Sequence, residues 1–135
     1  MTKHLAILRQ PYLDYILSGK KTIESRFPKV KCAPFGMIKA EDVVLLKEST
    51  GRVKGVFEVA KVSFFENVSF VDLCQIRKYE NEICSYLEED FWISRSSARY
   101  VTLLWIKNVR SYPEPYAYPK QDRRGWVVLK DDDKG

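Results

Sequence analysis

The residues of this chain best suited to chemistry lie in one short stretch, SGKKTIESRF, from Ser18 to Phe27. Within it, Lys21, Glu24 and Arg26 bring together a compact cation, a carboxylate and a planar guanidinium. An arginine can clamp a phosphate or a carbonyl through paired hydrogen bonds, and a lysine supplies a positive point charge. A glutamate between them can orient both cations or accept a proton. The functional interpretation is therefore a Lys21–Glu24–Arg26 constellation that binds a ligand or acts on it.

An extended backbone would set the directions of these side chains. Because successive side chains of a strand point to opposite faces, Thr22, Glu24 and Arg26 should share one face, and Ile23 and Ser25 the other. Ile23 is then the expected core residue, and Glu24 and Arg26 stand roughly 6–7 Å apart along the strand. The alternative interpretation is an exposed strand with a weak surface ion pair that contributes under about 1 kcal/mol. The residue types alone leave both interpretations open.

The surrounding elements are expected to be short strands interrupted by two helices. One helix begins at Pro11 and ends before Gly19, and a second begins at Ser69 with a capping-box pair to Asp72 and runs to Leu87. Gly55 and other small residues are expected to mark bends in a long strand. Strands are predicted at residues 4–8, 22–26, 42–48, 53–65, 100–109 and 126–129, and loops at 27–40 and 91–99. Residues 111–119 are expected to be extended but broken by prolines. This pattern predicts an α+β domain built on a curved sheet or small barrel, whose closure places the first strand near the last.

The charge distribution indicates a phosphate-bearing partner. The formal net charge is +5, with eight Lys/Arg against two Asp/Glu in residues 1–40, six against eleven in 41–92, and nine against five in 93–135. A fold that brings the two basic ends together would own one positive face, and such a face attracts phosphates. Ordinary solvated lysines are the alternative explanation of the same numbers.

Composition bounds the class of protein. At 135 residues, 45% hydrophobic and 30% charged, the chain is expected to form one domain over residues 1–130 with a polar tail at 131–135. No apolar run approaches the length of a membrane span, and the N-terminus lacks the pattern of a signal peptide. We therefore expect a cytoplasmic protein with no membrane contact.

The side chains that usually bind metals or act in histidine-based catalysis are few and scattered. The cysteines Cys32, Cys74 and Cys84 form no CxxC pair, which argues against a disulfide framework and against a zinc site. His4 is the single histidine and opens a strand that reads as buried. The sequence therefore predicts no metal, no cofactor and no histidine-dependent catalysis.

The charged stretch resembles the signature of the ASCH domain family, GxKxxExR, with Gly19, Lys21, Glu24 and Arg26 at the fixed positions. The lead-in QPYLDYILSG, the later RSSARYVTLLWIKNV and the closing RRGWVVL are also similar to the family, so the likeness covers most of the chain. The resemblance implies a small β-barrel of the PUA-like fold with two flanking helices. It also implies a cleft beside the motif that binds RNA, a nucleotide or a nucleoside.

The resemblance also implies possible hydrolase activity. Some small members resemble amidohydrolases that remove the acyl group of N4-acetylcytidine with a lysine, a threonine and a glutamate, and other members are ribonuclease-like. The lysine maps onto Lys21, whereas Glu24 occupies the position of the threonine. Thr22 is the nearby threonine, and Glu80 or Glu82 are the candidates for the family's glutamate.

The combined prediction is a binding domain for RNA or a nucleotide whose basic cleft surrounds the GxKxxExR motif. Hydrolysis with Lys21 and Glu24 as the catalytic pair is one alternative, and an adaptor domain that meets an acidic protein is another. The expected ligand-binding residues are Tyr12, Gly19, Lys21, Glu24, Arg26 and Arg99. Further candidates are Arg95, Arg123 and Arg124 for phosphates, and Phe27, Tyr100 and Trp126 for base stacking.

Overall fold

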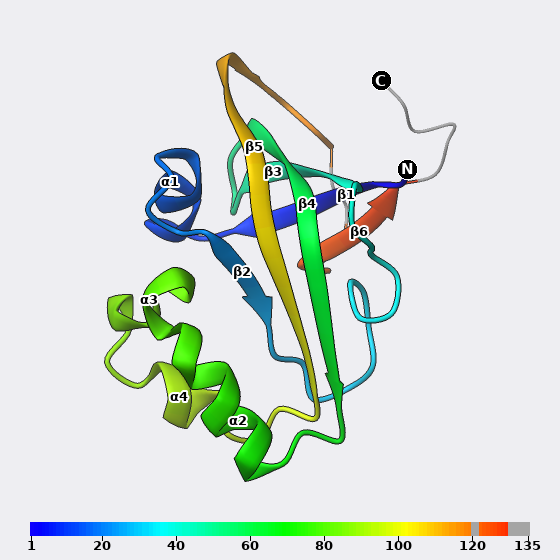
Figure 1. Cartoon of the computed structure of the whole chain (residues 1–135). Coiled ribbons are helices and arrows are strands. Elements are labelled where there is room, and N and C mark those ends of the chain that lie inside the picture. The colour runs from blue at the N-terminus through cyan, green and yellow to red at the C-terminus, as the bar shows by residue number, and fades with distance from the viewer. Residues whose placement is uncertain (120–121, 130–135) are drawn as a thin grey trace.

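Six strands of the chain form one mixed sheet in the computed structural model, which describes residues 1–119 and 122–129. The order of the strands across the sheet is β2-β5-β4-β3-β1-β6, and short helices gather beside β2 (Figure 1). The strands are β1 (Lys3–Leu8), β2 (Ile23–Arg26), β3 (Val43–Glu48), β4 (Val53–Glu66), β5 (Tyr100–Tyr116) and β6 (Trp126–Leu129). The predicted tail at 131–135 lies outside the described residues.

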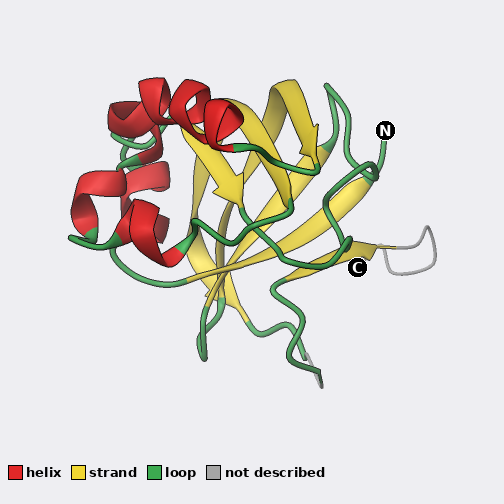
Figure 2. Ribbon diagram, turned by 90° about the horizontal axis from the view of Figure 1, so that it is seen from below, coloured by secondary structure: helices red, strands yellow, loops and turns green. Residues whose placement is uncertain are grey.

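The sheet curls because its two longest strands are bent. β4 and β5 pair antiparallel over most of their length, and their register shifts between Val53 and Gly55 and again near Ala60. Such irregularities bend a strand and increase its twist. A Cβ at Gly55 would lie 2.6 Å from the carbonyl oxygen of Arg110, so the close approach of β5 requires glycine there. The sheet becomes a half-barrel (Figure 2), which confirms the predicted α+β class and the expected bends.

The two ends of the chain meet in this sheet, as predicted. β1 pairs parallel with β3 and antiparallel with β6, with Leu5 opposite Val127 and Ala6 opposite Trp126. β2 and β6 are the two edges of the sheet. Sequence-distant segments therefore meet at the mouth of the half-barrel.

The first helix confirms its prediction, whereas the second is broken. Helix α1 (Tyr12–Leu17) buries Leu13 and Ile16, and the predicted capping box between Ser69 and Asp72 opens the second helical segment. A 3-10 turn interrupts this segment after Ile76, and the segment breaks again at Cys84, which adopts a left-handed conformation with φ of +64°. This conformation ends a helix and is usually adopted by glycine or asparagine. A cysteine at this position therefore carries no sequence signal for the helix end. The elements here are α2 (Phe70–Ile76), η1 (Arg77–Tyr79), α3 (Glu80–Ile83) and η2 (Ser85–Leu87).

One prediction for a loop was wrong in part, and the stretch predicted as extended belongs to a strand. Residues 91–94 form the one-turn helix α4 (Phe91–Ser94), and β5 continues through the proline-broken stretch to Tyr116. The continuation is possible because β5 meets β4 with a register irregularity there, opposite Val53 and Gly55. A proline lacks the N–H that a regular ladder needs, so it is tolerated at such an irregularity.

The core is divided by β5, whose side chains alternate between two apolar clusters. Leu104 belongs to the cluster that contains Trp126 and the buried face of α1. Leu103 belongs to a second cluster under the other helices, and this cluster also contains Ile23. The predicted core role of Ile23 is confirmed, and Trp126, a candidate for base stacking, is also buried in the core. β2 therefore lies between the helices and the half-barrel, with Ile23 packed into the core beneath the helices.

No helix among the described residues is both long enough and apolar enough to cross a membrane.

Candidate functional site

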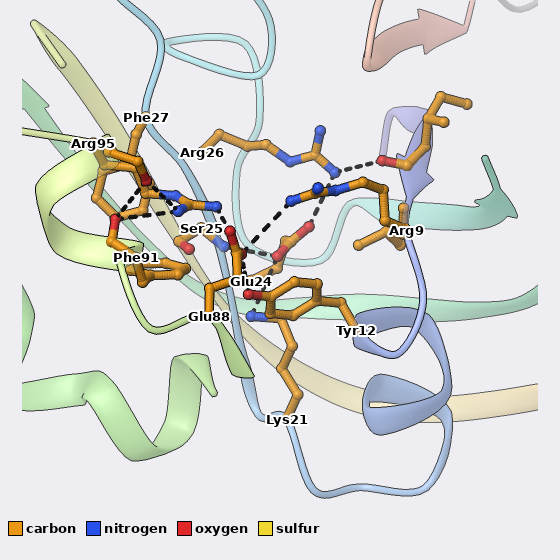
Figure 3. Close-up of a pocket in the computed structure, with 13 residues that line it drawn as sticks. Arg9, Tyr12, Lys21, Glu24, Ser25, Arg26, Phe27, Glu88, Phe91 and Arg95 are labelled. Atoms are coloured by element: carbon orange, nitrogen blue, oxygen red, sulfur yellow. Dashed lines mark hydrogen bonds and ion pairs between the residues drawn. The ribbon is translucent and has the colours of Figure 1, made fainter. Parts of the chain in front are cut away.

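A cleft of about 460 Å³ opens beside β2, between the edge of the half-barrel and the helical segments. Figure 3 shows side chains from both sides of this opening pointing toward one another. The residues that line it are Ile7, Leu8, Arg9, Tyr12, Lys21, Glu24, Ser25, Arg26, Phe27, Glu88, Phe91, Ser94 and Arg95. The cleft therefore contains the predicted constellation and adds charged and aromatic side chains from distant parts of the sequence.

The alternation of β2 directs the constellation into the cleft. Ile23 packs into the core under the helices, whereas Glu24 and Arg26 lie on the cleft side and join through a 3.0 Å hydrogen bond from Arg26 Nη2 to Glu24 Oε2. Lys21 is 2% exposed and Glu24 4%. The alternative of an exposed strand with a surface ion pair is therefore wrong.

Lys21 holds the helical segment against β2. Its ammonium donates to the carbonyl oxygens of Ile23 at 2.7 Å and Ile83 at 2.6 Å, and it lies 3.4 Å from Glu24 Oε1. Burial lowers the pKa of Lys21, and the neighbouring Glu24 carboxylate opposes this shift. Since an ammonium has three protons to donate, these acceptors match its charged form. Lys21 therefore joins the segment around Ile83 to β2 through its hydrogen bonds.

Glu24 is a buried carboxylate with a partner on each oxygen. The backbone N–H of Ser25 donates to Oε1 at 2.9 Å, and Arg26 donates to Oε2. Burial opposes the charge of Glu24, but Arg26 and Lys21 together hold its pKa below the usual range. Glu24 is therefore ionised, and it accepts hydrogen bonds from the groups that flank it.

Arg26 bridges the mouth of the half-barrel. Its guanidinium donates from Nη2 to the carbonyl oxygen of Ile7 at 3.0 Å and from Nη1 to that of Gly125 at 3.2 Å. It also lies over the ring of Trp126, 5.2 Å from the centroid. These contacts tie the edge strand β2 to β1 and to the residue that precedes β6. A Cβ at Gly125 would come within 3.1 Å of Nη1, so the absence of a side chain there makes room for Arg26.

The opposite side of the cleft is built around Glu88. Its Oε2 accepts from the hydroxyl of Tyr12 and from Arg95 Nη2 at 3.2 Å, and Arg9 Nη2 lies 3.6 Å away. Burial and Glu88 both raise the pKa of Tyr12. Although partial burial opposes it, hydrogen bonding from Tyr12 and Arg95 lowers the pKa of Glu88. Glu88 is therefore a charged carboxylate that receives donors from both sides of the opening.

An aromatic wall supports Arg95. Its guanidinium carbon lies 3.6 Å from the centroid of the Phe91 ring, and its Nη1 donates to the carbonyl oxygen of Phe91 at 3.2 Å. Phe27 meets Phe91 edge to face, with the ring centroids 5.8 Å apart. The cleft therefore combines cations with π-faces.

The predicted ligand-binding residues divide into two groups. Tyr12, Lys21, Glu24 and Arg26 line the cleft, whereas Gly19 and Arg99 do not. Gly19 has a φ of +84° just past α1, which lets the chain turn back toward β2. Its role in the motif is thus conformational, and Arg99 is exposed elsewhere on the surface.

The further candidates also divide. Arg95 and Phe27 line the cleft, whereas Arg123, Arg124, Tyr100 and Trp126 do not. Arg124 pairs with Asp122, Tyr100 packs against Phe35, and Trp126 is buried behind Arg26.

Arg9, Glu88 and Phe91 line the cleft without having been predicted from the sequence. Arg9 directly follows a strand and precedes the QPY segment, a position that could have drawn attention to it. Glu88 stands in a run of three acidic residues and carries no local signal of its own. Its position at the opening follows from the break of the second helix.

The residues suggested for an acyl-transfer site are not gathered in the cleft. Thr22 is exposed, Glu80 is exposed and pairs with Arg77, and Glu82 is half-buried. None of the three lines the opening. The lysine of that arrangement lines the cleft, whereas no threonine among the described residues does.

His4 is held in a buried chain of hydrogen bonds away from the cleft. Trp126 Nε1 donates to His4 Nδ1 at 3.1 Å, and His4 Nε2 donates to Asp42 Oδ2 at 3.0 Å. Burial lowers the pKa of His4, although Asp42 opposes the shift. Both ring nitrogens are occupied, so His4 is structural. Within residues 1–119 and 122–129, no group of three or more His, Cys, Asp or Glu is placed to hold a metal ion.

Solved structures share this fold. Similar structures include the crystal structure of ASCH from Zymomonas mobilis, with a TM-score of 0.73 and 13% identity over 96% of this chain and 89% of that chain. The N-terminal domain of Staphylothermus marinus McrB has a TM-score of 0.56 and 14% identity over 86% and 76% of the two chains. At these identities the likeness concerns the fold, and it confirms the predicted PUA-like class.

The sequence itself matches a family model, that of the ASCH domain, over residues 7–126. The match includes the whole GxKxxExR motif and every residue that lines the cleft. A search of curated protein sequences finds no significant match.

Proposed function

Because the chain belongs to the ASCH domain family, we propose that it binds a nucleotide, free or as a unit of single-stranded RNA, in the cleft beside β2. The observation that carries this proposal is the composition of the cleft wall, where four basic side chains stand beside three aromatic ones. The basic residues are Arg9, Lys21, Arg26 and Arg95, and the aromatic ones are Tyr12, Phe27 and Phe91.

This combination suits both halves of a nucleotide. Arginines bind phosphate oxygens through two parallel hydrogen bonds, and aromatic rings or guanidinium planes stack on bases. The volume of about 460 Å³ falls within the range of roughly 300–1,000 Å³ that is usual for small-ligand pockets.

The arginines have different freedom to meet a ligand. Arg26 uses both terminal nitrogens within the fold, whereas Arg9 is 68% exposed and has one ion pair at 3.6 Å. Arg9 is thus the cation that can turn to a phosphate at the lowest structural cost. The motif residues Lys21, Glu24 and Arg26 form the floor of the cleft. The more exposed Arg9 and Glu88 form its rim, where a ligand makes its first contact.

The test is a titration of a single-stranded RNA oligonucleotide and of the four nucleoside 5′-monophosphates at several salt concentrations. Binding should weaken as salt rises, because each neutralised phosphate releases counterions. Replacing Arg9 by alanine should weaken RNA binding and reduce the salt slope by about 1.

The matched control is Arg110→Ala, since Arg110 is exposed on β5 and does not line the cleft. An equal loss of affinity in both variants would indicate a general charge effect and contradict the proposed cleft. Arg99→Ala provides a second comparison, because Arg99 was predicted to bind ligand but lies outside the cleft.

The hydrolase alternative is tested by incubating N4-acetylcytidine and RNA with the wild-type protein and with Lys21→Ala. We expect no lysine-dependent turnover, because Lys21 is held by two carbonyl oxygens and no threonine in residues 1–119 and 122–129 lines the cleft. Turnover that disappears in Lys21→Ala, while that variant remains folded, would instead place the protein among the enzymes.

A further inference from the structure

Glu88 lies where donors from three separate elements converge. The hydroxyl of Tyr12 comes from α1, Arg9 from the segment after β1, and Arg95 from the end of α4. Tyr12 and Arg95 donate hydrogen bonds to the same carboxylate oxygen, Glu88 Oε2, and Arg9 forms an ion pair with it (Figure 3). Two guanidinium groups and a hydroxyl around one oxygen form an environment that suits an anion with more charge than a carboxylate.

The two arginines are prepared for an anion in different ways. Arg95 is held over the Phe91 ring and donates to the carbonyl oxygen of Phe91 and to Ser94 Oγ, so its direction is set before any ligand arrives. Arg9 is mostly exposed and makes a single long contact with Glu88. One arginine is therefore fixed and the other is free to close on a ligand.

Glu88 itself is weakly held by comparison with the buried Glu24. It is 25% exposed, and its hydrogen-bond and ion-pair partners among the described residues all address Oε2. Ion pairs at such exposure are screened by water and are readily exchanged. A phosphate offers three acceptor oxygens and a larger charge, so it can take these donors from Glu88.

We propose that Tyr12, Arg9 and Arg95 form a phosphate site, and that the Glu88 carboxylate occupies it until the phosphate of a nucleotide displaces it. This inference rests on the proposed function and names the subsite within the cleft. Glu88 acts as an internal competitor, which lowers the affinity for phosphates and keeps the arginines in place in the unbound protein. The site therefore selects phosphorylated ligands over the corresponding nucleosides.

The decisive variant is Glu88→Gln, which keeps the size of the side chain and its hydrogen-bonding oxygen while removing the negative charge. We expect its affinity for nucleoside 5′-monophosphates and for the RNA oligonucleotide to rise by up to about fivefold, the factor that corresponds to loss of one exposed ion pair. The affinity for the unphosphorylated nucleosides should not change.

Glu89→Gln is the matched control, because it makes the same change in net charge at the adjacent, exposed position outside the cleft. Equal gains in the two variants, or weaker binding of phosphorylated probes by Glu88→Gln, would overturn the inference. Arg95→Lys provides a second test, since it retains the charge but loses the paired donors. It should reduce the preference for monophosphates over nucleosides, and an unchanged preference would contradict the site.

The two proposals fail in different ways. If neither the wild type nor Glu88→Gln binds RNA or any monophosphate, the proposed function is wrong. If the wild type binds these probes and Glu88→Gln binds them with the same affinity, only the displacement of Glu88 is wrong. Thermal unfolding of each variant, measured in parallel, shows that the comparison is made between folded proteins.

Discussion

The floor and the rim of the cleft carry similar charges but differ in how those charges are held. On the floor, Lys21 and Glu24 are almost completely buried, and their polar atoms are directed at partners within the fold. At the rim, Arg9 is exposed and Glu88 is partly so. Charged residues of the same types therefore have two roles here, a structural one on the floor and a proposed ligand-binding one at the rim, which the charged motif alone does not distinguish. The floor residues hold β2, α3 and the mouth of the half-barrel together, whereas the rim residues are available to a ligand.

Replacing Lys21 should have the largest effect on stability. Lys21→Met retains the apolar stem but leaves the carbonyl oxygen of Ile83 and the buried Glu24 without the ammonium. Breaking a buried ion pair in this way costs about 3–5 kcal/mol of unfolding free energy. Urea denaturation measures the loss, and Lys20→Met is the control, since Lys20 is the exposed neighbour. Similar stability of the two variants would show that the floor is not a structural element.

Replacing Arg26 by lysine should have the next largest effect. A lysine keeps the charge but cannot reach Ile7, Gly125 and Glu24 at once with a planar fork. Loss of hydrogen bonds that involve a charged group should cost about 1.5–3 kcal/mol. The measurement is again urea denaturation. An unchanged midpoint would mean that the side-chain bridge between β2 and β1 adds nothing to the sheet.

Acid should weaken the floor through Glu24. Its folded pKa is depressed, so the stabilisation by its charge is complete above the unfolded value of about 4.3 and is lost as pH falls through the folded value. The unfolding free energy of the wild type should therefore exceed that of Glu24→Gln most at neutral pH. The difference should shrink below about pH 4, toward the folded pKa. A difference that stays constant with pH would contradict the assignment of this charge.

Replacing Arg9 should have the smallest effect on stability. Its side chain is exposed and has one long ion pair, so Arg9→Ala should change the unfolding free energy by less than about 0.5 kcal/mol. The same variant is expected to weaken RNA binding. A large loss of stability would show that Arg9 has a structural role like that of Lys21, and would contradict the difference in role between the floor and the rim.

The local predictions held where short-range geometry decides the outcome. The period of two along a strand placed Ile23 in the core and Glu24 and Arg26 toward the cleft, although Ser25 lines the cleft and Thr22 does not, the reverse of the prediction. The capping box at Ser69 and Asp72 marked the start of α2. The pairing of β1 with β6 followed from the expected closure of the sheet. The helix break at Cys84 was missed, since its left-handed conformation depends on packing and on no residue with a preference for it.

The sequence by itself determined the family motif, the α+β class, the burial of Ile23 on β2 and the burial of His4. Only the tertiary structure decided which charged side chains are paired and buried within the fold and which are exposed to solvent. It buried Lys21, left Arg99 outside the cleft, and brought Glu88 to Arg9 across a separation of 79 positions. The physical reason is that burial and charge pairing depend on neighbours that are distant along the chain. The spacing of residues within a motif carries no information about those neighbours.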